Sequence, residues 1–256
     1  RLCAREFVHE LTDTDLLRGR QCHAGQAEVA QQVLEQLALR AVERGPLAPA
    51  LPGRVVAGGG GTPATMQVFY GRRHDGGPFH TVLIRGGGLG AGAGQDGQGC
   101  FIFPANGANT PVEILESDAP LIVECRELLP DSGGPGRQRG APGRREVFRV
   151  PDDAYAPQPP VNLAIQSGRF RLPPEGLFGG RPGAKAQFLV NGRPGNPYGL
   201  TRLKPGDVVV MDAAGGGGYG DPAERDRALL ERDLREGKVS LEGARRDYAA
   251  RVTPDP

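Results

Sequence analysis

The sequence predicts an α+β protein in which a β-rich central region follows an N-terminal amphipathic helix and precedes a C-terminal helical hairpin. Apolar residues recur every four positions within residues 23–44, which indicates a helix. Short β-like runs separated by clusters of Gly and Pro follow, and helical periodicity returns only near the end of the chain. We therefore divide the chain into an N-terminal helical segment with its linker (1–52), a β-rich region (53–220) and a helical tail (221–256).

The N-terminal helix is predicted from an apolar stripe that ends before the helix-breaking pair Gly45 and Pro46. Four residues define the stripe: Val29, Val33, Leu37 and Ala41. A Pro-rich link, residues 46–52, then separates this helix from the β-rich region.

Strands are predicted wherever short apolar runs lie between turn-forming residues. In residues 120–129, for example, Leu121, Val123 and Cys125 alternate with Glu124 and Arg126, which is typical of a strand with one solvated face. The predicted strands cover residues 66–70, 80–85, 100–103, 120–129, 146–150, 161–166, 187–190 and 207–211.

The C-terminal hairpin is predicted from two capping signals. Asp221 can cap a helix that starts at Pro222 and carries Glu224 three residues after the cap. Gly237 would end this helix, and Ser240 can cap a last short helix that runs to about residue 248. Three apolar residues would share one face of the first helix: Ala223, Leu230 and Leu234.

The charge balance argues against nucleic acid and membranes as partners. The chain has 31 basic and 30 acidic side chains, so its net charge of +1 produces no chain-wide field. The sequence also contains no apolar run of about 18 residues, the length that a membrane-spanning helix needs. We expect neither partner.

The cysteines and histidines show no metal-ligand spacing. Cys3, Cys22, Cys100 and Cys125 form no CxxC pair, and the four histidines form no HxH or HExxH pattern. We therefore predict no zinc cluster and no disulfide framework, and we expect a reducing, cytoplasmic setting. The GxSxG turn of a serine nucleophile is absent as well, so these patterns identify no catalytic residue.

The stretch AAGGGGYGDPAERD, residues 213–226, resembles a phosphate-binding loop only superficially. A P-loop carries Lys and Ser or Thr after its last glycine, whereas Asp221 and Pro222 follow here. A dinucleotide-binding fold would need a βαβ unit, but the chain ends after the predicted helices. We interpret the stretch as a flexible loop between a strand and a capped helix.

Two further segments each allow two interpretations. The run GGGLGAGAGQDGQG, residues 86–99, looks too plastic to pack, and it is either an active-site lid or a disordered connector. Residues 130–149 carry five arginines against Asp131 and Glu146, which suits either a phosphate-bearing or RNA ligand or a solvated loop.

Five blocks of the sequence resemble, in order, the second half of the B-type subunit of the hydantoinase/oxoprolinase family. The resemblance covers about residues 57–248. The blocks are FPANGANTPVEILES (103–117), ELLPDSGGPGRQRG (127–140), LPPEGLFGGRPGA (172–184), LKPGDVVVMDAAGGGGYGDP (203–222) and GGGGYGDPAERDRALLERDLREGKVSLEGARRDY (215–248).

This resemblance implies a function shared with a partner. Family members act with an ATP-using A-type subunit, and together they hydrolyse cyclic amides such as hydantoins or 5-oxoproline. The nucleotide is held by the A-type partner, and a divalent metal would be held by the N-terminal half of the B-type subunit. We expect this chain to be the C-terminal portion of such a subunit and to be inactive alone.

Five residues are the candidate substrate contacts that follow from the resemblance. Asn106, Asn109 and Thr110 could hydrogen-bond a cyclic imide from a Pro-bounded loop, or they could form only a turn. Arg137 and Arg139 could reach an anionic intermediate or a partner surface, because guanidinium suits carboxylate and phosphate geometry.

Two other functional classes stay open at the level of the sequence. Related complexes carboxylate ketones such as acetone, and such a complex would need bicarbonate in addition to ATP. A non-catalytic scaffold would bind the A-type subunit and show no substrate dependence of its own.

Overall fold

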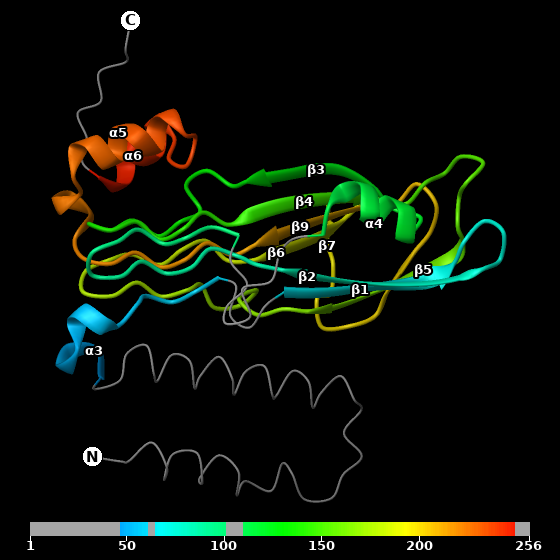
Figure 1. Cartoon of the computed structure of the whole chain (residues 1–256), viewed down its shortest axis with the longest axis horizontal. Coiled ribbons are helices and arrows are strands. Elements are labelled where there is room, and N and C mark those ends of the chain that lie inside the picture. The colour runs from blue at the N-terminus through cyan, green and yellow to red at the C-terminus, as the bar shows by residue number, and fades with distance from the viewer. Residues whose placement is uncertain (1–46, 61–64, 101–109, 249–256) are drawn as a thin grey trace, which may run out of the picture.

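The computed structural model describes residues 47–60, 65–100 and 110–248, and all structural statements below concern these residues. Two antiparallel sheets face each other, and a set of extended glycine-rich segments continues beyond one end of them (Figure 1). This arrangement confirms the predicted β-rich α+β class. Among the described residues, no helix combines the length and the apolar character needed to cross a bilayer.

The sheets contain four and five strands. The first has the order β2-β1-β5-β8 and the second the order β3-β4-β9-β6-β7. The strands are β1 (Thr65–Arg72), β2 (Pro78–Arg85), β3 (Ile122–Leu128), β4 (Arg144–Arg149), β5 (Gln158–Gln166), β6 (Gln187–Val190), β7 (Arg193–Pro194), β8 (Thr201–Leu203) and β9 (Val208–Ala213). The helices are α3 (Leu47–Ala50), η1 (Pro52–Arg54), α4 (Val112–Asp118), η2 (Pro222–Glu224), α5 (Arg227–Arg235) and α6 (Leu241–Asp247).

Seven of the eight predicted strands are confirmed, since each overlaps an observed strand: β1, β2, β3, β4, β5, β6 and β9. For the eighth, Cys100 lies in a turn and residues 101–103 lie outside the described part of the chain. The short strands β7 and β8 were not predicted, because two or three residues carry no alternating pattern. The predicted N-terminal helix, residues 23–44, also lies outside the described residues.

The apolar core lies between the two sheets. Phe69 of β1 and Phe148 of β4 are both almost fully buried, and their ring centroids lie 5.6 Å apart across the sandwich. Leu163 and Val209 extend the same core, and α4 contributes Leu115. Burial of each such side chain favours folding by about 1.5–3 kcal/mol, so this layer holds the two sheets together.

The glycine-rich segments form an ordered unit that we call the glycine-rich bundle. Its members are residues 57–60, 86–98, 132–143, 174–184 and 214–220, joined by backbone hydrogen bonds. Residues 214–220 are all buried and run through the others. The prediction that residues 86–99 are too plastic to pack was therefore wrong. Their amides and carbonyls find partners on distant segments, as in Gly88 N–H to Ala214 O and Ala91 N–H to Gly217 O.

The central segment of the bundle has a repeat of three residues. The amides of Gly215 and Gly218 donate to the carbonyls of Ala184 and Arg181, which belong to one neighbouring segment. The amides of Gly216 and Tyr219 donate in the same way to Ala141 and Gln138, and that of Gly217 donates to Gly58. A β-strand would return to the same neighbour every second residue, whereas a polyproline II helix has three residues per turn. The segment therefore meets the same neighbouring segment every third residue, as the threefold repeat of a polyproline II helix requires.

Glycine is required here because the segments approach each other too closely for side chains. A Cβ atom at Gly216 would overlap the carbonyl of Leu89, and one at Gly217 would overlap the carbonyl of Glu175. The same constraint makes glycine obligatory at the axis of the collagen triple helix. The interpretation of residues 213–226 as a flexible loop was thus incomplete: the run does link β9 to a capped helix, but its glycines are fixed in a packed assembly.

The helical tail follows its predicted caps with one correction. Asp221 accepts a hydrogen bond from Ala223 N–H, but the helix that it caps is only the 3₁₀ turn η2. Arg225 is extended, and α5 begins afterwards with its own cap, Asp226. Ala223 therefore does not share a face of α5 with the other predicted apolar residues. Leu230 of α5 packs instead against Val239, Ala244 and Tyr248, which lie within or beside α6.

The end of α5 and the start of α6 are confirmed. Gly237 follows α5 with a φ of +68°, the left-handed conformation that terminates helices. Ser240 accepts a hydrogen bond from Gly243 N–H and caps α6.

Replacing Gly216 by Ala should destabilise the protein severely, because the new methyl group would displace the backbone at Leu89. We expect the free energy of unfolding, measured by urea denaturation, to fall by at least ~3 kcal/mol. Gly94→Ala is the matched control, since it lies in another glycine-rich segment and a Cβ there meets nothing within 4 Å. It should change stability by less than ~0.5 kcal/mol. Equal effects of the two substitutions would contradict the packed bundle.

Candidate functional site

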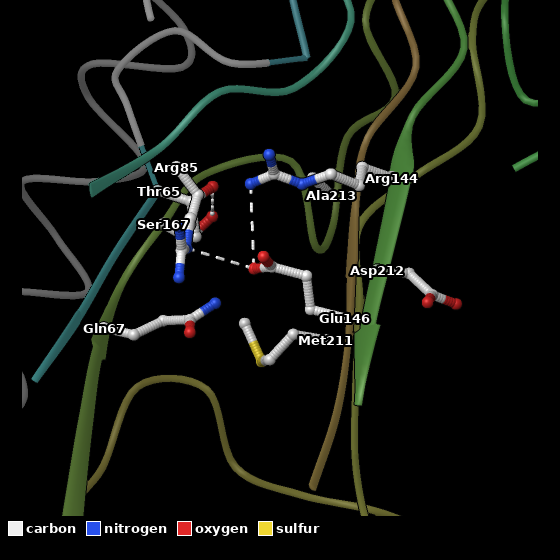
Figure 2. A pocket seen from close by; sticks show the side chains of 9 residues that line it. All are labelled: Thr65, Gln67, Arg85, Arg144, Glu146, Ser167, Met211, Asp212 and Ala213. Carbon is white, nitrogen blue, oxygen red and sulfur yellow. Dashed lines mark hydrogen bonds and ion pairs between the residues drawn. The ribbon is translucent and has the colours of Figure 1, made fainter. Parts of the chain in front are cut away.

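A polar cavity lies between the two sheets, at the end where the strands pass into the glycine-rich bundle (Figure 2). Thr65 is the first residue of β1 and pairs with Arg85, the last residue of β2. Arg144 begins β4 and pairs with Ala213, which ends β9. Because these four strand ends meet at one level, their side chains enclose the same space. The complete lining is Thr65, Gln67, Arg85, Arg144, Glu146, Ser167, Met211, Asp212 and Ala213.

Arg85, Arg144 and Glu146 of the lining, together with Arg126, which binds Glu146 from outside the lining, form what we call the arginine cluster. Glu146 Oε2 lies 3.2 Å from Arg85 Nε and 3.6 Å from Arg144 Nη2, while Oε1 lies 2.8 Å from Arg126 Nε. The side chains of Arg85, Arg144 and Glu146 are at most 4% exposed, whereas that of Arg126 is 20% exposed. The cluster therefore meets solvent on the side of Arg126.

The remaining walls are mostly neutral and polar. Thr65 Oγ1 and Ser167 Oγ are hydrogen-bonded at 2.8 Å, and Gln67 is buried nearby. Asp212 also lines the cavity, but both of its oxygens accept hydrogen bonds from Arg145, each at 2.8 Å. The charge of Asp212 is thus balanced by Arg145, and Glu146 supplies the negative charge next to Arg85, Arg126 and Arg144.

Burial and like charge perturb Arg85. Desolvation, together with the charges of Arg126 and Arg144, lowers the pKa of Arg85 to about 10, although Glu146 opposes the shift. Arg85 therefore stays charged at neutral pH. The cavity has room for about one water molecule. Such a site favours a small, negatively charged or strongly accepting group.

Metal and nucleotide ligation find no support in the described part of the chain. No group of three or more His, Cys, Asp or Glu side chains lies close enough there to hold a metal ion. The glycine run does not suit a nucleotide phosphate either. The six amides from Gly215 to Gly220 all donate to backbone carbonyls, so none of them is left to bind an anion.

Of the five predicted substrate contacts, the three that the structure describes are not gathered in one place. Asn106 and Asn109 lie outside the described residues. Thr110 lies beside the arginine cluster, since its carbonyl accepts a hydrogen bond of 3.0 Å from Arg126 Nη1. Arg137 is largely exposed and lies 3.5 Å from Glu224.

Arg139 is bound inside the protein. Its Nε and Nη2 donate to the two oxygens of Asp233, at 2.9 and 3.1 Å, and Asp233 is fully buried. Arg225 Nη2 also donates to Asp233, at 2.5 Å, and Arg225 forms two hydrogen bonds with Asp96. Burial would raise the pKa of Asp96, but the hydrogen bonds and charge of Arg225 hold it below its usual range. These four side chains attach α5 to the glycine-rich bundle.

Sequence reasoning missed the cluster, although one signal was present. In β4, Arg144, Glu146 and Phe148 alternate with Arg145 and Val147, so they point to one face. Since Phe148 belongs to the apolar core, the charged pair on its face must also be buried. The sequence gives no comparable signal for Arg85 and Arg126. They lie on β2 and β3, and only the pairing of the strands brings them close to Glu146.

Comparison with known proteins gives consistent similarities over most of the chain. The sequence pattern of the hydantoinase B/oxoprolinase family matches residues 19–222. The caprolactamase subunit beta of Pseudomonas jessenii is 30% identical over 216 residues, which cover 79% of this chain and 36% of that protein. The acetophenone carboxylase delta subunit of Aromatoleum aromaticum is 28% identical over 228 residues, covering 73% and 33%.

A solved structure gives the same picture. The ATP-dependent caprolactamase of Pseudomonas jessenii superposes with a TM-score of 0.65 at 25% sequence identity, over 82% of this chain and 38% of that chain. The chain therefore spans about a third of the length of the relatives that it matches.

Replacing Glu146 by Gln should destabilise the protein more than replacing Arg85 by Met. Loss of the carboxylate leaves three guanidinium groups around a neutral amide, whereas loss of Arg85 leaves Glu146 with two partners. We expect Glu146→Gln to lower the free energy of unfolding by about 3–5 kcal/mol. The double variant should show a coupling of about 0.5–3 kcal/mol.

The control for this cycle is Glu124→Gln, because Glu124 pairs with Arg149 in a half-exposed position on the same sheet. It should cost about 1 kcal/mol or less in the same urea titration. A larger loss for Arg85→Met than for Glu146→Gln would mean that Glu146 does not hold the cluster together.

Replacing Asp233 by Ala should release the helical tail. The substitution leaves the guanidinium groups of Arg139 and Arg225 buried, with one carboxylate fewer, so we expect a loss of about 3–5 kcal/mol in stability. Glu231→Ala, on the same helix, removes only an exposed ion pair with Arg227 and should cost about 0.5 kcal/mol. Equal stability of the two variants would show that the ion pairs of Asp233 do not hold α5 to the glycine-rich bundle.

Proposed function

Because the chain belongs to the hydantoinase B/oxoprolinase family, we propose that it forms part of the B-type subunit of an ATP-dependent complex that hydrolyses a cyclic amide. The observation that carries the proposal is the family match over residues 19–222, together with the 30% identity to a caprolactamase subunit beta. The substrate class follows from that relative, whose name specifies a lactam. The chain would act as one component and not as a complete enzyme.

The proposal assigns ATP to an A-type partner subunit. An amide bond is stabilised by resonance, so ring opening by water alone is slow, and ATP bound to the complex would activate the carbonyl group by phosphorylation. The glycine run of this chain offers no free amides for a phosphate, which supports placing the nucleotide on the partner. Two features favour a cytoplasmic location: the complex would consume ATP, and the four cysteines do not have the spacing of a disulfide framework.

Substrate contacts remain proposals based on side-chain chemistry. We place Asn106, Asn109 and Thr110 at the amide of the substrate; the backbone carbonyl of Thr110 accepts a hydrogen bond from Arg126, which puts Thr110 beside the arginine cluster. Arg137 is exposed and could meet an anionic group or the partner surface. Arg139 is left out, because its guanidinium is buried and bound to Asp233.

A ketone carboxylase is the second candidate function. It is favoured by the 28% identity to an acetophenone carboxylase delta subunit, which covers 73% of the chain. A scaffold that binds the A-type subunit without serving a reaction is the third. The three candidates differ in what must be added before ATP is consumed.

The test is phosphate release by the full-length B-type subunit that contains this sequence, co-purified with its A-type partner. We expect caprolactam, hydantoin or 5-oxoproline to stimulate ATP hydrolysis, with one ring opened for each stimulated turnover. The 256-residue chain alone should show no turnover. Omitting either subunit provides the matched control.

Other outcomes separate the remaining candidates. Stimulation that requires both a ketone and bicarbonate would replace the hydrolase with a carboxylase. A stable complex whose ATP consumption responds to neither class of compound would favour the scaffold.

A further inference from the structure

We propose that the arginine cluster is a binding site for one small anion, of the size of chloride or formate, held by Arg85 between the two sheets. The site goes beyond the proposed function, because it needs neither ATP nor a partner subunit. It is formed entirely by side chains of this chain (Figure 2).

The first argument is the state of the Arg85 side chain. It is 1% exposed, and none of its three guanidinium nitrogens makes a hydrogen bond to a residue that the structure describes. Its ion pair with Glu146, at 3.2 Å, lacks hydrogen-bond geometry. Hydrogen-bond donors that are buried without an acceptor are costly, and a charged group raises the cost. An acceptor that fits the cavity would remove this penalty.

The second argument is charge. Arg85 and Arg126 share the single carboxylate of Glu146, and Arg144, which has further interactions of its own, also lies near it. The other carboxylate of the lining, Asp212, is bound to Arg145 through both oxygens. Arg85 and Arg126 carry two positive charges, and Glu146 carries one negative charge. Among the described residues, one of the two positive charges therefore has no matching carboxylate. Buried ions need such a counter-charge, and a bound anion supplies it.

The third argument is the character and size of the space. Thr65, Ser167 and Gln67 add neutral hydrogen-bonding groups on the same side of the cavity as Arg85 (Figure 2). The cavity has room for about one water-sized group, which admits chloride or a formate oxygen and is too small for sulfate or phosphate. Arg126 is 20% exposed, so an anion can approach along its side chain.

The experiment uses the full 256-residue chain in gluconate buffer at constant ionic strength, with chloride and formate as probes. We expect saturable broadening of the chloride NMR signal, reversed by formate, and a saturable rise in the thermal unfolding midpoint with each probe. Sulfate and phosphate should not reverse the broadening. Absence of saturable chloride or formate binding to the wild-type chain would overturn the proposal, and competition by sulfate or phosphate would overturn its size limit.

Two variants locate the site. Arg85→Met should weaken chloride binding by at least ~10-fold, since it removes charge-assisted hydrogen bonds. Arg149→Met, on the same strand as Arg144, removes a half-exposed arginine that pairs with Glu124 and Asp152 outside the cavity, and binding should be retained. Equal binding by wild type and Arg85→Met, or equal loss in both variants, would show that the anion binds elsewhere.

A third variant tests the role of the competing carboxylate, while chloride binding to the wild type stays decisive if Arg85→Met does not fold. Glu146→Gln removes the competing carboxylate, so chloride should bind at least ~10-fold more tightly than to the wild type. A purely structural cluster predicts lower stability without any gain in anion affinity. Unchanged or weaker chloride binding by folded Glu146→Gln would therefore overturn the proposal.

Discussion

The backbone hydrogen bonds around residues 214–220 are the constraint on which the rest of the structure depends. This segment receives or donates bonds to each of the other four members of the glycine-rich bundle. Those members continue directly from the ends of strands or lead into their starts, as residues 86–98 follow β2 and residues 132–143 precede β4. The bundle therefore fixes how the strand ends of both sheets meet, and with them the position of the arginine cluster (Figure 1).

A bundle whose closest contacts are made by glycines must be stabilised differently from the sandwich. The sandwich gains free energy by burying apolar side chains such as Phe69 and Phe148, whereas glycines bury little apolar surface and lose more backbone entropy than other residues. Backbone hydrogen bonds contribute about 0.5–1.5 kcal/mol each, so the bundle needs many of them together. Polar clusters lie at both of its ends: the arginine cluster at the sheets, and the ion pairs of Asp233 at the helical tail.

These two clusters differ in how completely their charges are matched. At the tail, Arg139 and Arg225 share Asp233, and Asp96 supplies a second carboxylate, so the two buried arginines are matched by two carboxylates. Between the sheets, Arg85 and Arg126 share the one carboxylate of Glu146, and within the described part of the chain Arg85 makes no hydrogen bond. A balanced cluster serves the fold, whereas an unbalanced buried cluster is the arrangement expected where a ligand belongs.

The sequence by itself determined the strands with clear alternation, the caps at Asp221 and Ser240, and the family, because these features are written in side chains a few residues apart or in long ordered motifs. It could not determine the glycine-rich bundle. Glycine carries no side-chain pattern, and the partners of residues 214–220 lie up to about 160 residues away, as Gly58 does from Gly217. Only the tertiary structure brings Arg85, Arg126 and Glu146 from three strands around one cavity, since their contacts depend on strand register and not on local spacing.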